Sequence, residues 1–390
     1  MKNFILKQKI LELCITEGSQ SPGDISKALN SSIPTITKLV GELIIEGYIE
    51  DFGKIDTSGG RRPSIYGLNP YAGYFIGIDV TAEGFIIATT DFKGDTVDFA
   101  RYEGFTLSNN AESFQTFCGM IRDHISNIEI SQEKVLAYGV SFSGRVNSRT
   151  GESFSYIMKD GKDIRSVMEK GLEKPVFIEN NSRAMTYGEY LCGRHGKKSN
   201  ILFINVSWGL GMGMIIDGRL TFGKSGFSGE IGHFPILDNN QICQCGKTGC
   251  LETGASCSAL HRTITEKLRS GRSSMLSEKF SKEGKISMSD IMEAIHEEDI
   301  LAIETVEQVG LTLGKAVAGL INLFNPELII IGGLLASASE YLRLPVMTAI
   351  QKHTLNVISR DTEIKFSSLG EQAGAIGACM IARSRLIGIL

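Results

Sequence analysis

The sequence predicts an α/β protein with a small helical unit at its N-terminus and two α/β lobes behind it. Residues 1–70 show helical apolar spacing interrupted by short breaks, whereas residues 71–390 contain strands that precede helices in two successive halves. The chain of 390 residues is also longer than one ordinary hydrophobic core supports. We therefore place a domain boundary at Asn69-Pro70, which divides the chain into a domain of residues 1–70 and a domain of residues 71–390.

The first 70 residues predict three short helices followed by a hairpin. Apolar residues at helical spacing occur near the N-terminus, after the break GSQSPG and after the break NSS. Two extended segments then surround the glycine-rich tip SGGRRP. In the third helix we expect five apolar residues on one buried face: Ile33, Ile36, Val40, Leu43 and Ile44.

The opposite face of the third helix and the hairpin tip have side chains that suit contacts with DNA. Thr35, Thr37 and Lys38 are small or polar, which lets the second helix of a helix-turn-helix lie in the major groove. Arg61 and Arg62 at the tip can grip phosphates or enter a minor groove. Charge alone does not decide, because this unit contains eight basic and eight acidic residues. We expect a winged helix-turn-helix that binds DNA; the alternative is a helical module that binds protein.

Strand and helix patterns alternate from Tyr74 onward. YFIGIDV, GFIIATTDFKG and DTVDFARYEGF predict three consecutive strands joined by short turns. Further strands are predicted at VLAYGVSFSG, KPVFIEN, ILFINVSW, GMGMIIDGRL and ELIIIGG, with helices over 110–127, around 163–171 and from Ser182. This order favours two lobes with a cleft between them, although the sequence shows no close internal repeat.

Composition excludes several classes of protein. Hydrophobic residues make up 42% and charged residues 22%, and the net charge of −4 gives no general attraction to nucleic acid or membrane. The N-terminus has no signal-peptide pattern, and the longest uncharged run, 199–216, contains polar residues and glycines typical of strands. Eight cysteines without a secretion signal indicate a reducing compartment, so we expect a cytoplasmic protein with no membrane segment.

The stretch GEIGHFPILDNNQICQCGKTGCLET concentrates metal-binding side chains. His233, Cys243, Cys245 and Cys250 have the spacing H-x9-C-x-C-x4-C, and these four donors suit tetrahedral Zn²⁺. A complete set of four protein ligands leaves no open position for a reactant, so the zinc is expected to be structural. A redox switch or three reduced loop cysteines are the alternatives.

The helical unit followed by ENN, GEIGH, CQCGKTGCLE and INLFNPELIIIGG resembles the ROK family of repressors, open reading frames and sugar kinases over nearly the whole chain. The resemblance implies an actin-like, ribonuclease-H-like two-lobed fold of the ATPase type for residues 71–390, and assembly as a homodimer or homotetramer. It also implies the zinc site described above. The residues that it implies for sugar binding are Asn180, Glu230, His233 and Glu252, to which we add Asn181.

The sequence departs from the kinases of this family at three places. The kinases have an aspartate base directly after the pocket asparagine, where this chain has Asn181, and an amide cannot take a proton from a hydroxyl. Thr81-Ala82-Glu83 replaces the glycines of the first phosphate loop, which puts a negative charge there. Trp208 replaces the threonine of the second phosphate loop. We therefore expect no enzymatic activity and assign no catalytic residue.

These features together predict a sugar-responsive transcriptional regulator, a repressor of carbohydrate-utilisation genes, whose degenerate kinase domain senses the effector. Its expected partners are double-stranded operator DNA and a monosaccharide or sugar phosphate. Two alternatives remain open at this point. One is an active ATP-dependent sugar kinase with an appended DNA-binding unit, and the other is a zinc-stabilised protein that binds other proteins.

Overall fold

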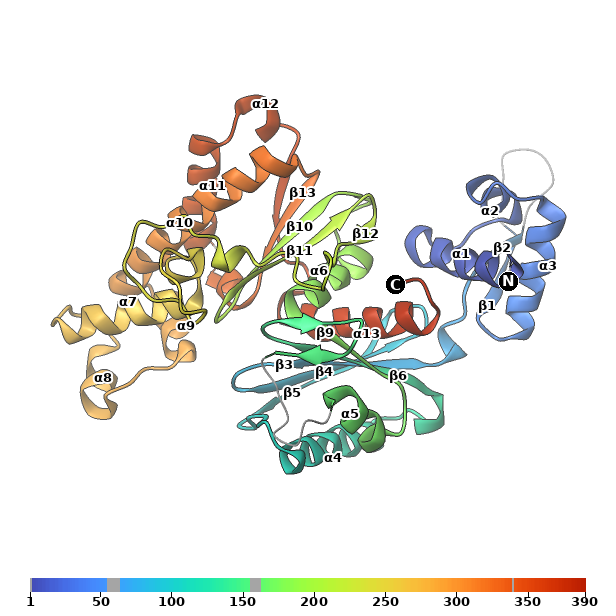
Figure 1. The fold of residues 1–390 in the computed structure, drawn as a ribbon, viewed down its shortest axis with the longest axis horizontal. Helices are drawn as coiled ribbons and strands as arrows, with labels where there is room; N and C mark the ends of the chain where they lie inside the picture. The colour runs from blue at the N-terminus through green and yellow to red at the C-terminus, as the bar shows by residue number, and fades with distance from the viewer. Residues whose placement is uncertain (1, 55–63, 155–162, 339) are drawn as a thin grey trace. The chain divides into compact units, whose positions relative to one another are not determined.

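The computed structural model describes residues 2–54, 64–154, 163–338 and 340–390 (Figure 1). It contains two compact units, of which the first combines Met1–Cys192 with Gly374–Leu390 and the second is Gly193–Ala373. The first unit therefore includes both the N-terminal helices and the first α/β lobe. The C-terminal helix returns to this unit, so the lobe is closed by residues from both ends of the chain.

The N-terminal part has the predicted three helices and hairpin, hereafter the head. Ser21 and Ser32 cap the second and third helices, because each hydroxyl accepts a hydrogen bond from the backbone N–H three residues on. The bounds are α1 (Lys2–Glu17), α2 (Pro22–Ala28), α3 (Ile33–Ile45), β1 (Ile49–Lys54) and β2 (Ser64–Leu68), with β1 and β2 antiparallel.

The buried face of α3 differs in part from the prediction. Ile36, Val40 and Leu43 are buried as expected, but Ile33 is 54% exposed and Ile44 is 38% exposed, so these two assignments were wrong. The missing core residue is Leu39, which is fully buried. The reason is rotational: a face centred on residues 36, 39, 40 and 43 turns position 33 and position 44 towards solvent.

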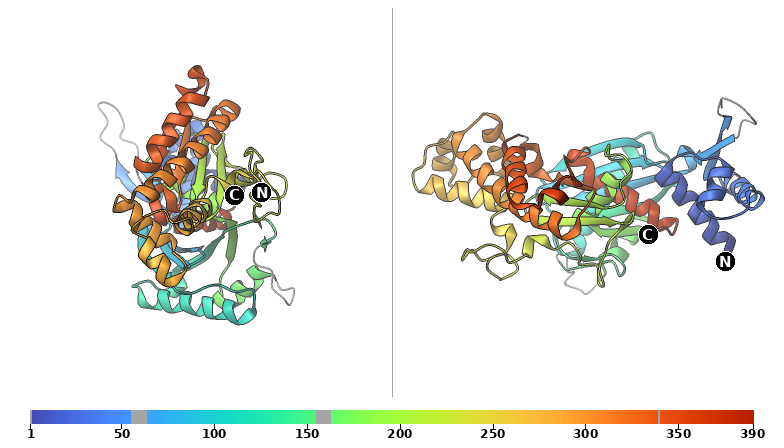
Figure 2. Two further views of the ribbon diagram at one scale, coloured as in Figure 1. Left: turned by 90° about the vertical axis from the view of Figure 1, so that its left-hand side faces the viewer. Right: turned by 90° about the horizontal axis from the view of Figure 1, so that it is seen from above.

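The first lobe is built on a five-stranded sheet with the order β5-β4-β3-β6-β9. Strands β5, β4 and β3 are antiparallel neighbours, and β6 and β9 continue in parallel with β3. Helices α4 and α5 cover one face, and α13 lies on the other (Figure 1; Figure 2). The bounds are β3 (Tyr74–Val80), β4 (Gly84–Asp91), β5 (Thr96–Glu103), α4 (Ala111–Asn127), β6 (Val135–Phe142), β7 (Val146–Asn147), β8 (Glu152–Ser153), α5 (Ile164–Leu172), β9 (Val176–Asn180), α6 (Asn181–Cys192) and α13 (Ala373–Leu386).

The second lobe repeats the topology of the first. Its sheet has the order β12-β11-β10-β13-β14, again three antiparallel strands followed by two parallel ones. The two lobes therefore share one architecture, although their sequences show no close repeat. The bounds are β10 (Ile201–Val206), β11 (Leu210–Ile216), β12 (Arg219–Leu220), α7 (Cys257–Arg269), α8 (Ser277–Glu283), α9 (Met288–His296), α10 (Ile300–Phe324), β13 (Leu328–Gly332), α11 (Glu340–His353), α12 (Asn356–Ser359) and β14 (Glu363–Phe366).

The predicted strands and helices are confirmed, including those over 110–127 and 163–171. No helix within the described ranges is long and apolar enough to cross a membrane.

Helix α13 lies unusually close to the first sheet, because glycines face it. A Cβ atom at Gly77 would come within 1.9 Å of the Ala375 carbonyl oxygen, and a Cβ at Gly139 within 1.9 Å of the Ala378 carbonyl oxygen. Neither distance is compatible with a side chain, since both neighbours are backbone atoms. The close approach of the C-terminal helix thus depends on these two glycines.

We predict that Gly139→Ala destabilises the protein by about 1–3 kcal/mol, because the added methyl group forces α13 away from the sheet. Gly119→Ala is the matched control: position 119 is helical and has no atom within 4 Å of an added Cβ. The control should keep or raise the melting temperature. Equal melting temperatures for the two variants in a thermal-unfolding scan would contradict the close contact.

Candidate functional site

Four side chains of the second unit converge as the sequence predicted. One ligand atom from each of His233, Cys243, Cys245 and Cys250 lies within 4.8 Å of all the others. His233 ends the short 3-10 helix Ile231–His233, and Cys250 immediately precedes another, Leu251–Thr253. The Cys243 sulfur is 3.5 Å from His233 Nδ1, and the Cys245 and Cys250 sulfurs are 3.6 Å apart.

These separations fit a tetrahedral zinc ion. Bond lengths of about 2.3 Å to sulfur and about 2.0–2.1 Å to nitrogen give tetrahedral edges of about 3.8 Å between sulfurs and about 3.5 Å between nitrogen and sulfur. Nδ1 is the nitrogen of His233 that lies beside the Cys243 sulfur, and it is the ring atom that would bind the metal. The other ring nitrogen, Nε2, is 3.8 Å from a carboxylate oxygen of Glu230. A bound zinc would supply structural cross-linking of this loop, since all four positions are taken by protein.

Backbone contacts shape the cysteine loop for a cation. Gly246 has a φ of +82°, and its N–H donates to the Cys243 carbonyl at 2.8 Å. The backbone N–H of Lys247 lowers the pKa of Cys245, whereas burial raises the pKa of Cys243 to about 12. A thiolate at the buried Cys243 would need a compensating positive charge, and a bound zinc ion would be one source of it.

Glu252 connects the cysteine loop to the turn between β10 and β11. One carboxylate oxygen of Glu252 accepts a hydrogen bond from the Leu210 N–H at 3.0 Å, and the other is 3.7 Å from the Cys243 sulfur. Glu230, by contrast, is exposed. The second unit thus brings the two predicted glutamates to the one loop that carries the cysteine cluster, with the Glu252 carboxylate fixed and the Glu230 carboxylate open to solvent.

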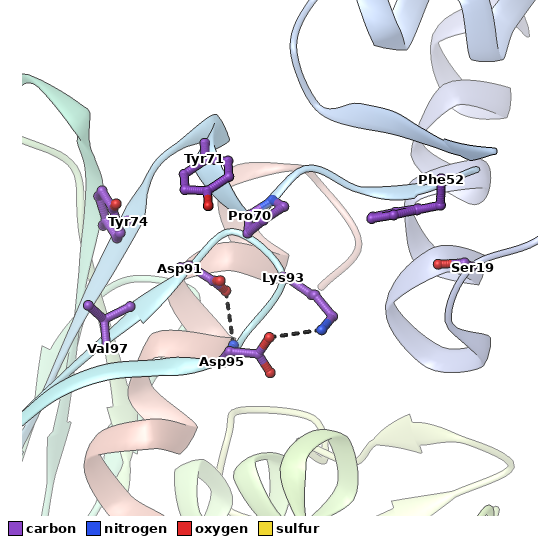
Figure 3. A pocket seen from close by; sticks show the side chains of 9 residues that line it. All are labelled: Ser19, Phe52, Pro70, Tyr71, Tyr74, Asp91, Lys93, Asp95 and Val97. Carbon is purple, nitrogen blue, oxygen red and sulfur yellow. Dashed lines mark hydrogen bonds and ion pairs between the residues drawn. The ribbon is translucent and has the colours of Figure 1, made fainter. Parts of the chain in front are cut away.

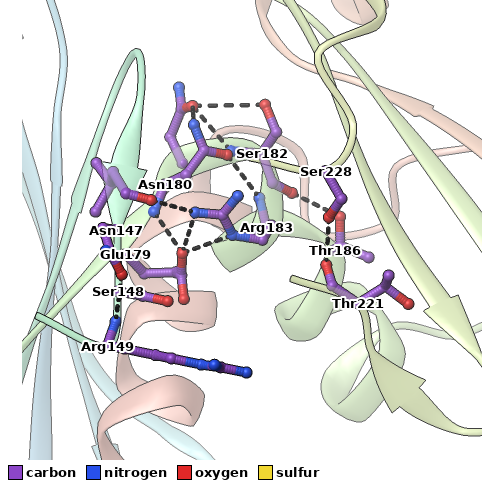
Figure 4. Close-up of polar contacts among 12 residues, drawn as sticks. Asn147, Ser148, Arg149, Glu179, Asn180, Ser182, Arg183, Thr186, Thr221 and Ser228 are labelled. Atoms are coloured by element: carbon purple, nitrogen blue, oxygen red, sulfur yellow. Dashed lines mark hydrogen bonds and ion pairs between the residues drawn. The ribbon is translucent and has the colours of Figure 1, made fainter. Parts of the chain in front are cut away.

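The ENN triplet lies in the first unit, at the junction of β9 and α6 (Figure 4). Glu179 is fully buried and binds Arg183 at 2.7 Å, and Arg385 lies 3.5 Å from its other oxygen. Arg183 also donates to the Val146 carbonyl at 3.0 Å. This buried carboxylate is neutralised by arginines, so its role is to hold the end of β9 in place.

Asn180 and Asn181 follow Glu179 directly. The Asn180 amide donates to the Gly144 carbonyl at 2.8 Å. The Asn181 amide donates to the Ser143 hydroxyl at 3.1 Å, and its oxygen accepts from the Ser182 N–H at 2.8 Å. Both residues are partly exposed. Their assignment to sugar binding, together with Glu230, His233 and Glu252 of the second unit, stays a prediction.

The first of the altered phosphate loops is a tight turn between β3 and β4. The Thr81 N–H donates to the Gly84 carbonyl at 3.0 Å, which leaves Glu83 exposed at the tip. Asp79, at the end of β3, is buried and accepts a hydrogen bond from the Ser141 hydroxyl at 2.5 Å. Burial raises the pKa of Asp79 to about 6. At its exposed tip the turn therefore presents the carboxylate of Glu83, where a phosphate loop would present the N–H groups of glycines.

In the head, the predicted DNA-contact residues of α3 are exposed. Thr35, Thr37 and Lys38 all point away from the buried face of the helix. Arg61 and Arg62 lie outside the described residues.

Glu42 is the acidic residue of α3, and Glu46 is the residue that caps its C-terminus. Lys7 of α1 binds Glu42 at 2.8 Å and Glu46 at 2.6 Å, and Lys38 lies 3.9 Å from Glu42. The N-terminal half of α3 contains no acidic residue.

A hollow of about 510 Å³ lies where the head meets the first lobe (Figure 3). Its wall includes Phe52 of β1, Tyr71 and the turn between β4 and β5. Lys93 of that turn pairs with Asp95 at 2.8 Å, and Asp91 accepts the backbone N–H groups of Gly94 and Asp95. Each of these three charged side chains already has a partner within the turn, and we assign the hollow to the junction of head and lobe.

Sequence reasoning missed the groups that hold the site residues in place. Arg385 lies 206 residues after Glu179, and the Leu210 N–H lies 42 residues before Glu252. A buried glutamate predicts a cationic partner in general, but no local pattern identifies which arginine it is.

Comparison with known proteins agrees with this geometry. The ROK family model matches residues 75–385. The xylose repressor of Bacillus subtilis (strain 168) is 28% identical over 393 residues, covering 100% of this chain and 98% of the repressor. The glucokinase of Halalkalibacterium halodurans is 27% identical over 315 residues, covering 80% of this chain and 96% of the kinase. A solved ROK family transcriptional regulator, a homologue of the E. coli MLC protein, has a TM-score of 0.80 and 26% identity, covering 100% of this chain and 98% of the regulator.

We predict that Cys245→Ser releases the metal, because a neutral hydroxyl replaces a thiolate ligand. Metal analysis of the purified wild-type protein should find about one zinc per chain, and the variant should contain much less. Cys192→Ser is the control, since Cys192 lies outside the cluster and should leave the zinc content unchanged. Full zinc occupancy in Cys245→Ser would refute the assignment.

Proposed function

Because the chain belongs to the ROK family, we propose that it is a sugar-responsive, DNA-binding repressor of carbohydrate-utilisation genes. Its two lobes act as an effector sensor and not as a kinase. We place the protein in the cytoplasm, because its proposed DNA target is there and because cysteine thiols stay reduced and able to bind metal there. We also propose that it binds double-stranded operator DNA and a monosaccharide or sugar-phosphate effector, and that it assembles as a homodimer or homotetramer.

The head is the single observation that carries this proposal. Its three helices and antiparallel hairpin precede the family match, which begins at residue 75. The xylose repressor aligns over the whole chain including the head, whereas the glucokinase aligns over 80% of it. A kinase has no need of a winged helical unit, but a repressor requires one to reach DNA.

The surface of α3 supports its role as the recognition helix. Lys7 binds both Glu42 and Glu46, and Lys38 lies 3.9 Å from Glu42, so two lysines offset the two carboxylates closest to the face that would meet phosphates. Thr35, Thr37 and Lys38 are then the side chains that reach base edges and backbone. Arg61 and Arg62 on the wing add phosphate or minor-groove contacts. A dimer would read a palindrome whose half-sites are spaced by whole helical turns.

In the sensor, the side chains that we propose bind the sugar hydroxyls are those of Asn180, Asn181, Glu230, His233 and Glu252. Carboxylates and amides pair with the adjacent hydroxyls of a sugar ring. With Nδ1 of His233 on the metal, its Nε2–H is left to donate to a hydroxyl or to Glu230. Zinc on His233, Cys243, Cys245 and Cys250 would hold His233 and the two flanking glutamates, Glu230 and Glu252, in one conformation.

Phosphoryl transfer is disfavoured by the chemistry of the same positions. Asn181 donates to Ser143 and has no basic atom that could take the proton of an attacking hydroxyl. Glu83 at the first turn repels a triphosphate. Effector binding then acts only by favouring one conformation of the protein. A coupling of about 1–3 kcal/mol between the sugar and DNA sites changes operator affinity by about 5–150-fold.

We predict sequence-selective binding to the DNA upstream of the protein's own gene, weakened or strengthened by one monosaccharide or sugar phosphate in a panel. A footprint with and without each sugar measures both effects. The affinity should fall steeply with salt, as expected for several phosphate contacts. A protein that protects no specific sequence under any of these conditions is not the repressor proposed here.

We predict that Lys38→Ala and Arg61→Ala each weaken operator binding by about 1 kcal/mol or more while sugar affinity stays unchanged, because they remove DNA contacts alone. Lys282→Ala is the matched control, since Lys282 is an exposed lysine of the second unit. Fluorescence anisotropy with a labelled operator measures the difference. Operator affinities equal to that of the control would exclude these side chains from the interface.

We predict no sugar-dependent ADP release in a coupled ATPase assay over a hexose panel, because no base is present at position 181. The H. halodurans glucokinase serves as the positive control. Turnover above the protein-free background would favour the kinase alternative.

A further inference from the structure

We propose that Trp208 forms an aromatic wall of the effector site and that the effector is an unphosphorylated pyranose sugar stacked on its indole. This inference rests on the proposed sensor function, since it concerns the same site. Trp208 is the only tryptophan in the sequence, and it lies in the turn between β10 and β11. The side chain is 45% exposed, although burying an aromatic ring of this size is strongly favourable.

The turn holds the indole in a defined position. The Ser207 N–H donates to the Gly209 carbonyl at 3.1 Å, and the Ser207 hydroxyl accepts from the Leu334 N–H at 3.3 Å. The Trp208 carbonyl accepts from the Ser258 N–H at 3.1 Å. The ring of His261 lies 5.6 Å from the indole, tilted by 58°, and supports it from one side. The exposed part of the ring is therefore preorganised and not a loosely attached surface group.

Glu252 places the turn that carries Trp208 beside the carboxylates proposed to bind the sugar. Its Oε2 atom accepts from the Leu210 N–H at 3.0 Å, and a Cβ at Gly209 would lie 2.8 Å from the same oxygen. The carboxylate thus packs directly against the residue next to Trp208. Through Glu252 the aromatic turn is joined to the metal loop that carries Glu230 and His233. One corner of the second unit therefore combines an aromatic face with acceptors for hydroxyl groups.

This combination matches the two-sided chemistry of a pyranose. The C–H groups of the ring form an apolar face that packs on an aromatic ring, and the hydroxyls at the rim need charged or polar acceptors. A ligand site with a mainly apolar wall and a few fixed polar groups is the usual arrangement for a small molecule.

The same corner is unsuited to a phosphate group. The N–H groups at the start of α7 are already satisfied: Cys257 donates to the Ser207 carbonyl at 3.0 Å, Ser258 to the Trp208 carbonyl, and Ala259 to the Ser256 hydroxyl at 3.1 Å. They are the groups that would bind an anion at a helix N-terminus. Glu230 and Glu252 add negative charge. A phosphorylated sugar would meet repulsion here without compensating donors.

The test uses the fluorescence of the single tryptophan together with an independent measure of binding. The zinc-loaded protein is titrated with neutral hexoses and pentoses and with their phosphate esters, while emission and melting temperature are recorded in parallel. Trp208→Ala and Trp208→Phe are compared with Tyr71→Ala, a control that removes an exposed aromatic ring of the first unit. Zinc content is measured for each variant to confirm that the metal loop is intact.

The expected result is a neutral sugar that raises the melting temperature and changes the Trp208 emission. Its affinity should fall by about tenfold or more in Trp208→Ala, less in Trp208→Phe and not in Tyr71→Ala, and the phosphate ester should bind at least about tenfold more weakly. Suppose that a sugar stabilises the protein but leaves the Trp208 emission unchanged and binds Trp208→Ala as tightly as the wild type. This result would reject the role of Trp208 as a wall of the site and leave the sensor function standing. A phosphate ester that binds more tightly than its neutral sugar would overturn the effector class. Stabilisation by neither class of compound would reject the sensor function itself, and the wall with it.

Discussion

The convergence of His233, Cys243, Cys245 and Cys250 is the constraint on which the rest of the second unit's site depends. The loop that carries them is mostly exposed, including the apolar side chains of Phe234, Ile236 and Ile242, so burial of apolar surface contributes little to its order. A metal coordinated by the four side chains would supply the cross-links that a hydrophobic core supplies elsewhere. Glu230 and Glu252 lie at the two ends of this loop, and Glu252 extends the constraint to the turn of Trp208.

The two lobes share one sheet topology but contribute different chemistry. The second lobe supplies carboxylates and a histidine on the loop that carries the His/Cys cluster, and an aromatic ring on the neighbouring turn between β10 and β11. The first lobe supplies two amides at the end of a strand that the buried Glu179–Arg183 pair holds in place. An amide at position 181 preserves the ability to bind a hydroxyl and removes the ability to activate it. Binding without chemistry is what a sensor requires, because the ligand then persists and can alter only the distribution of conformations.

Local features were predictable from the sequence, and long-range ones were not. His233, Cys243, Cys245 and Cys250 lie within eighteen residues, and their spacing alone predicted that these four side chains converge. The strands and helices followed from periodicity, as at 110–127. The face of α3 was assigned in part wrongly, because the helix contains seven aliphatic residues that allow more than one choice of buried face, and the burial of Leu39 shows which face is used. The contacts of Glu252 with Leu210 and of Glu179 with Arg385 join distant segments that no local pattern connects. The two lobes have the same sheet topology because their strands pair in the same order. Their amino-acid sequences contain no close repeat, so this similarity was not predictable from sequence.

The central claim is that sugar and operator bind one protein at separate sites through a shared conformational equilibrium. Its most direct test is the affinity of the effector sugar for the free protein and for the operator-bound protein, measured by titration calorimetry. Linkage requires that the operator change sugar affinity by the same factor by which the sugar changes operator affinity. The account predicts equal factors, each between about 5 and 150. A sugar that binds equally well in the presence and absence of the operator would contradict it.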